Sequence, residues 1–131
     1  MPSKLLTHWL PVIAWATLIF LFSANPDPYG LLPETIDKSW DTFIGTTMHF
    51  LEYAVLSLLL ARALSKNQSL KRSHIYLTIL LSILYSLSDE IHQLYVPGRT
   101  FQLLDLFVDF LGIQAGVFLF IKIKKKKYSP T

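Results

Sequence analysis

Apolar residues fill four long segments of this chain, with short polar stretches between them. The segments cover about residues 5–23, 46–64, 74–95 and 103–123. Each holds about 20 residues, and a helix of that length crosses a hydrocarbon core about 30 Å thick. Because only helices or closed barrels satisfy every backbone polar group in lipid, the pattern predicts an all-α membrane protein. The expected architecture is a bundle of about four transmembrane helices.

A soluble helical bundle is the alternative to this architecture. It would require amphipathic stripes with charged outer faces, and residues 5–23 have none. Pro11 lies near the start of that segment, where a missing N–H costs least. Phe22-Ser23-Ala24 is similar to a signal-peptide cleavage site, but we expect an uncleaved first span.

The stretch between the first two segments, residues 24–45, is long for a small bundle. Its Pro- and Gly-containing start favours turns. After Pro33, apolar side chains recur at helical spacing, at Ile36, Trp40, Phe43 and Ile44. This spacing predicts a short interfacial helix in the first outer loop, either as a lid over an outer site or as a plain connection.

The composition agrees with a membrane protein. The 131 residues are 52% hydrophobic and 16% charged, and the mean hydropathy is +0.42. These values fit a single transmembrane domain over residues 1–131. Because the chain has no cysteine, it has neither disulfides nor thiolate metal sites. We expect no cofactor.

The basic residues predict how the chain crosses the membrane. If both termini are cytoplasmic, ten of the 12 Lys and Arg residues lie inside, and only Lys38 and Arg99 lie outside. The excess of positive charge on the inner side favours this orientation. The tail, residues 124–131, is then a basic cytoplasmic segment next to anionic lipid, so the net charge of +3 does not indicate a nucleic-acid partner.

The stretch from Ser88 to Gly112 places ionisable residues among apolar ones. Such residues are costly at membrane depth and indicate a functional site. One face of the third segment carries Ser82, Ser86, Asp89 and Gln93, and Glu90 lies beside it. One face of the fourth segment carries Asp105, Asp109, Gly112 and Gly116. The two glycines permit close helix packing.

A turn at Val96-Pro97-Gly98-Arg99 joins these two segments, and Pro-Gly suits a type II turn. The polar ends of both helices should therefore meet. In the second segment His49, Glu52 and Tyr53 share a face, and Ser23 ends the first segment on the same side. These residues predict one outward-facing polar cavity, lined by Ser23, His49, Glu52, Tyr53, Asp89, Glu90, Gln93, Arg99, Asp105 and Asp109.

Four interpretations of this polar cluster are open. In the first, it only holds the helices in register, and Arg99 bridges Asp89 and Asp105. In the second, Arg99 clamps an anionic group, and Ser23, His49, Glu52, Tyr53, Gln93 and Asp109 help to bind it. In the third, the cluster is catalytic, with Asp89, Glu90, His49 and Asp105 as candidates for acid and base roles. A divalent metal site is the fourth, but no H-E-x-x-H string is present, so we expect no metal site.

Several of these residues together resemble the VanZ-like family of small bacterial membrane proteins. They are Ser23, the string His49-Phe-x-x-Tyr53, Asp89-Glu90-x-x-Gln93, Pro97-Gly98-Arg99, Asp105, and Gly112 with Gly116. The resemblance implies a multipass protein of the bacterial cytoplasmic membrane. The family's namesake is linked to resistance to the glycopeptide teicoplanin, but the resemblance implies no biochemical activity.

This chain departs from the family pattern at two positions. Thr46 stands where many relatives have Lys, and Asp109 stands where many have Asn. The leading hypothesis is a polar pocket that engages a lipid-linked or anionic cell-envelope molecule and contributes to teicoplanin-type tolerance. The alternatives are an intramembrane enzyme acting on a lipid-linked phosphate or sugar, and a structural protein that recruits envelope enzymes. The sequence does not indicate an oligomeric state.

Overall fold

The computed structural model describes residues 4–27, 38–66 and 71–128. These residues form four helices: α1 (Lys4–Ser23), α2 (Lys38–Ser65), α3 (Arg72–Gln93) and α4 (Leu103–Tyr128). The described ranges contain no strand. The structure therefore confirms the prediction of an all-α membrane bundle.

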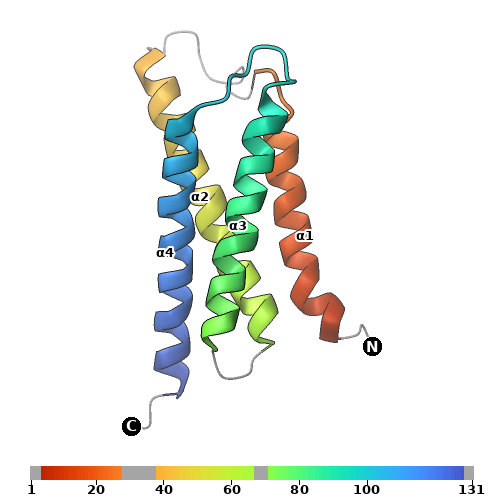
Figure 1. The fold of residues 1–131 in the computed structure, drawn as a ribbon, viewed down its shortest axis with the longest axis vertical. Coiled ribbons are helices and arrows are strands. Elements are labelled where there is room, and N and C mark those ends of the chain that lie inside the picture. Colours follow the sequence, from red (N-terminus) through yellow and green to blue (C-terminus); the bar gives the residue numbers. More distant parts are fainter. Residues whose placement is uncertain (1–3, 28–37, 67–70, 129–131) are drawn as a thin grey trace.

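The helices lie side by side along one long axis (Figure 1). Helices α2 and α4 form the most extensive contact, and α3 packs against both of them. Helix α1 contacts α2 and α3, whereas no contact joins its described residues to α4. Helix α1 begins and α4 ends at the same end of the bundle (Figure 1). We call the opposite end, where α3 turns into α4, the hairpin end.

Two glycines allow the close approach of α4 to α2. A Cβ at Gly112 would overlap the carbonyl oxygen of Phe50, and one at Gly116 would overlap that of Ala54. The Ser57 hydroxyl of α2 also lies 3.2 Å from the carbonyl oxygen of Ile113 in α4. The glycine pair therefore serves packing, as the sequence predicts.

Helix α3 has its polar face inside the bundle and its apolar face outside. Its buried residues are all polar, namely Thr78, Ser82, Ser86, Asp89, Glu90 and Gln93. Its exposed residues include Leu77, Leu80, Leu84, Leu87 and Ile91. A soluble helix has the reverse arrangement. This inverted pattern is typical of a helix surrounded by lipid, where polar groups turn towards other helices.

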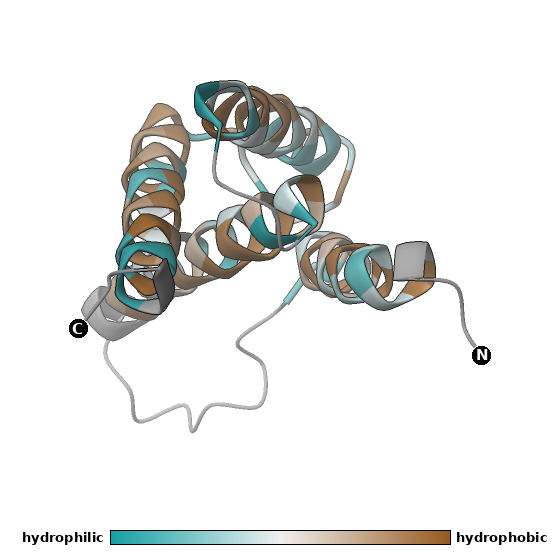
Figure 2. Ribbon diagram, turned by 90° about the horizontal axis from the view of Figure 1, so that it is seen from below, coloured by the Kyte–Doolittle hydropathy of each residue, from teal (hydrophilic) through white to brown (hydrophobic). Residues whose placement is uncertain are grey.

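Three helices are long and apolar enough to cross a membrane, over Leu6–Ser23, Phe43–Ser65 and Leu103–Lys126. Helix α3 does not reach the same average hydropathy, because its buried polar face lowers the mean. Viewed along the bundle, apolar residues predominate on the helices (Figure 2). The third predicted span is therefore a helix of transmembrane length, 22 residues, with a polar inner face.

The predicted interfacial helix does not exist as a separate element in the described residues. Helix α2 begins at Lys38 and runs without a break to Ser65, so Phe43 and Ile44 belong to its first turns. Ile36 lies outside the described residues. Without a proline or glycine between Lys38 and Ile44, the helical backbone continues directly into the apolar span. Similarly, Lys124–Lys127, predicted as a basic tail, continue α4.

The turn between α3 and α4 has the predicted form. Gly98 has φ +83° and the amide of Arg99 donates to the carbonyl of Val96 over 3.1 Å. This is the arrangement of a type II turn, which requires positive φ at its third residue. The turn brings Arg99 back over the end of the bundle, beside the start of α4.

Candidate functional site

A cavity of about 220 Å³ opens at the hairpin end. Its walls come from the first half of α2, the end of α3, the turn and the start of α4. The polar lining residues include His49, Gln93, Arg99, Gln102 and Asp105. All of the predicted site residues except Arg99 lie on helices, so the packing of the helices determines the shape of the cavity.

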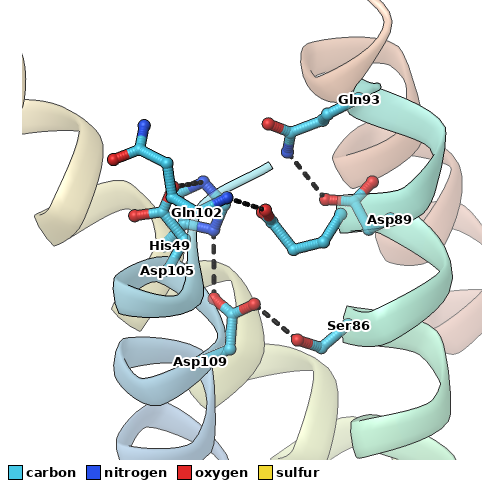
Figure 3. Close-up of polar contacts among 8 residues, drawn as sticks. His49, Ser86, Asp89, Gln93, Gln102, Asp105 and Asp109 are labelled. Carbon is cyan, nitrogen blue, oxygen red and sulfur yellow. Dashed lines mark hydrogen bonds and ion pairs between the residues drawn. The ribbon is translucent and has the colours of Figure 1, made fainter. Parts of the chain in front are cut away.

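His49 of α2 is held by two carboxylates of α4 (Figure 3). Its Nδ1 lies 3.0 Å from Oδ1 of Asp109, and its Nε2 lies 3.9 Å from Oδ2 of Asp105. An ionised Asp109 only accepts hydrogen bonds, and with Asp109 in this form Nδ1 carries the proton of the short contact. Nε2 is then the ring nitrogen on the side of Asp105 and the cavity.

Asp109 is itself held by α3. The hydroxyl of Ser86 donates to Oδ2 of Asp109 over 2.6 Å, and the carboxylate is almost completely buried. Asp109 thus links α2, α3 and α4 through two hydrogen bonds (Figure 3). This connection restrains the His49 ring in one orientation.

The acids of α3 have only partial hydrogen bonding. Oδ2 of Asp89 accepts a 3.4 Å hydrogen bond from Nε2 of Gln93. Oε2 of Glu90 accepts a 3.0 Å hydrogen bond from the backbone amide of Gln102, just before α4. Within the described part of the chain, Oε1 of Glu90 is buried and has no hydrogen-bond partner. Because Glu90 is fully buried, this oxygen lacks the hydrogen bond that buried polar atoms usually have.

Arg99 does not bridge Asp89 and Asp105. Among the described residues, both ion pairs within 4.0 Å involve His49, and neither involves Arg99. Its Nε is buried and has no hydrogen-bond partner among these residues. Arg99 lines the cavity instead. The interpretation in which Arg99 bridges two acids and holds the helices in register is therefore wrong for this chain.

The structure brings the ten predicted site residues to the hairpin end, in two groups. His49, Gln93, Arg99 and Asp105 line the cavity. The other six are not among its lining residues: Ser23, Glu52, Tyr53, Asp89, Glu90 and Asp109. Ser23 lies beside Asp89, and Glu52 is close enough to interact electrostatically with His49 and Asp89. Tyr53 is fully buried in the apolar core, with its ring 6.4 Å from that of Tyr85.

Sequence reasoning did not assign roles to two residues that complete the site. Ser86 belongs to the polar stripe of the third segment, which is the signal that could have identified it as a partner of Asp109. Gln102 acts through its backbone amide, which no residue pattern reveals. At the end of α3, the ring of His92 packs 4.8 Å from that of Phe20 in α1.

Three of these side chains are close enough to share a metal ion. His49, Glu90 and Asp105 each offer one ligand atom, and these atoms all lie within 4.8 Å of one another. The residues come from three different helices, which explains why no ligand string is visible in the sequence. The absence of such a string therefore carries little weight against a metal.

A comparison with protein families identifies the family of this chain. The VanZ/LLP1 family model matches residues 8–124, nearly the whole chain. The chain belongs to the VanZ/LLP1 family. The match includes all four helices and every predicted site residue, from Ser23 to Asp109. No curated protein and no solved structure is significantly similar to this chain.

Proposed function

We propose that this VanZ/LLP1-family membrane protein binds an anionic group of a cell-envelope molecule in the hairpin-end cavity. The position of Arg99 carries the proposal, because this residue lines the cavity and forms no ion pair with any described residue. The planar fork of a guanidinium fits phosphate and carboxylate oxygens. Gln93 and His49 lie on the same cavity wall and can add hydrogen bonds.

The neighbouring acids do not neutralise Arg99 directly. Asp105 and Asp109 face His49, Asp89 accepts from Gln93, and Glu90 accepts from a backbone amide. Among the described residues no carboxylate pairs with this guanidinium, which leaves it available to an anionic partner from outside the protein. A lipid-linked phosphate suits this site, since it would present its head group at the end of a membrane bundle.

The proposed location is the bacterial cytoplasmic membrane, with both termini in the cytoplasm and the cavity on the outer side. The basic side chains at the end opposite the cavity support this orientation, among them Arg62, Lys71, Arg72 and Lys122. Tolerance to teicoplanin-type glycopeptides would be the physiological consequence of binding an envelope molecule.

Native mass spectrometry from lipid-containing detergent tests the anion site. We expect an anionic envelope lipid to remain bound to the wild type and to be lost from Arg99→Gln. Arg72→Gln is the matched control, because Arg72 is exposed at the opposite end of the bundle. Equal lipid retention by Arg99→Gln and the wild type, in protein that is folded and inserted, would refute the proposal.

A second candidate function is an intramembrane enzyme acting on a lipid-linked phosphate or sugar. The observation that favours it is the restraint of His49 by Asp109 at Nδ1, with Nε2 on the cavity side. Catalytic histidines are commonly oriented by a carboxylate in this way. Turnover of candidate lipid carriers by purified protein, lost in Glu90→Gln, would favour the enzyme, whereas binding without turnover favours the pocket.

A further inference from the structure

We propose that His49, Glu90 and Asp105 form a binding site for one divalent transition-metal cation. Helices α2, α3 and α4 each contribute one residue, and the three ligand atoms lie within 4.8 Å of one another. His49 and Asp105 line the cavity, while Glu90 is fully buried. The site does not depend on the anion proposal, because its ligands exclude Arg99.

The spacing of the ligand atoms suits an ion with short bonds. Such ions take nitrogen and oxygen ligands at about 2.0–2.2 Å, so two ligands on one ion are at most about 4.4 Å apart. Nε2 of His49 and Oδ2 of Asp105 are 3.9 Å apart, within this limit. The widest pair of the three has to close by less than an ångström, which small side-chain rotations provide.

The His49 ring has the support that a metal ligand requires. A metal-binding histidine usually donates its second ring N–H to a carboxylate or carbonyl, which orients the ring and makes the free nitrogen more basic. Here Nδ1 pairs with Asp109 over 3.0 Å, and Asp109 accepts a second hydrogen bond from Ser86 over 2.6 Å. This outer layer leaves Nε2 available to a cation on the cavity side.

The buried carboxylate of Glu90 supports the metal site independently. One of its oxygens accepts from the amide of Gln102, but the other is buried without a hydrogen-bond partner in the described ranges. A fully buried polar atom without a partner is costly. The carboxylate comes from α3 and belongs to the same group of ligand atoms as His49 and Asp105. A cation bound there would supply the missing partner.

The charge of the surroundings also favours a cation. Among the described residues, five carboxyl groups lie in this region, against the guanidinium of Arg99 and the imidazoles of His49 and His92. The five are Glu52, Asp89, Glu90, Asp105 and Asp109. One imidazole and two carboxylates suit Mn²⁺ or Zn²⁺, whereas Mg²⁺ and Ca²⁺ prefer oxygen ligands alone. Three protein ligands leave coordination positions open towards the cavity. A bound ion would therefore face the same space as Arg99.

Electron paramagnetic resonance with Mn²⁺ alone tests the site. The full-length protein is purified in an uncharged maltoside detergent, treated with a chelator, and titrated with Mn²⁺ without any anionic lipid. We expect one bound ion per chain and a nitrogen coupling from the imidazole, which His49→Gln abolishes. We expect Glu90→Gln to weaken binding by about 100-fold or more, because changes in the outer layer alone cost about 10- to 100-fold.

Two further variants serve as controls. Asp27→Asn makes the same change of carboxylate to amide at an exposed residue and should leave Mn²⁺ affinity unchanged. Glu52→Gln removes a nearby acid that is not a ligand and should weaken binding much less than Glu90→Gln. Equal weakening by Glu52→Gln and Glu90→Gln would indicate diffuse attraction and overturn the proposal. If Glu90→Gln misfolds, the wild-type spectrum still provides a separate criterion: bound Mn²⁺ without nitrogen coupling also overturns the proposal.

Discussion

Nδ1 of His49 and Oδ1 of Asp109 lie 3.0 Å apart, although 60 residues separate them in the chain. The contact joins α2 to α4 inside the bundle, and Ser86 extends it to α3. Both donors point at one carboxylate that is almost completely buried. Asp109 is therefore the centre of the three-helix network.

Replacing Asp109 tests how the network contributes to stability. Asp109→Asn can still accept from His49 and can donate its NH₂ to the Ser86 hydroxyl, so we expect a small change. Asp109→Leu leaves the His49 N–H and the Ser86 hydroxyl unpaired and should cost about 1–3 kcal/mol. Denaturant-driven unfolding in bicelles measures both. Equal stability of the Leu variant and the wild type would contradict a structural role for these hydrogen bonds.

Packing between α2 and α4 depends on Gly116. Gly116→Leu would overlap the backbone of Ala54, and we expect a loss of about 1–3 kcal/mol in the free energy of unfolding. Leu119→Ala on the same helix is the control, because Leu119 is 49% exposed and should tolerate truncation with little change. If both variants unfold at the same denaturant concentration, the close approach of α2 and α4 does not determine the stability of the bundle.

Helix α1 is attached to the bundle by side-chain hydrogen bonds. The Tyr85 hydroxyl donates to the carbonyl of Ala16 over 2.6 Å, and the Trp15 indole donates to the carbonyl of Glu52 over 2.9 Å. Tyr85→Phe should reduce stability by about 0.6 kcal/mol, and at most about 1.7, the range of such bonds between membrane helices. Tyr76→Phe, at a 70% exposed position, should be neutral in the same assay.

The orientation in the membrane is open to direct labelling. The chain has no cysteine, so single cysteines introduced at Thr100 and Ser73 can be labelled without background. Both residues are exposed, one beside the cavity and one at the opposite end, at the start of α3. We expect an impermeant thiol reagent to label Thr100→Cys in intact cells and Ser73→Cys only after lysis. The reverse result would place the cavity in the cytoplasm.

Much of the fold follows from the sequence alone. The apolar segments predict the helices, because a backbone in lipid has to satisfy its hydrogen bonds within a helix. The polar stripe of the third segment and the Pro97-Gly98 turn also predict that acids from two helices meet. In the described residues, the apolar positions predicted as an interfacial helix are the first turns of α2, because helical spacing does not distinguish the start of a long helix from a separate short one.

The sequence by itself determined the class of protein, the inverted face of α3 and the end of the bundle that carries the polar residues. Periodicity and turn chemistry are local, so they can be read along the chain. Only the tertiary structure decided which of those residues meet. It separated Arg99 from the acids predicted to pair with it, and it joined His49 to Asp109. Among the described residues it also left one oxygen of Glu90 without a partner. Contacts between helices depend on rotation and depth, which no residue spacing specifies.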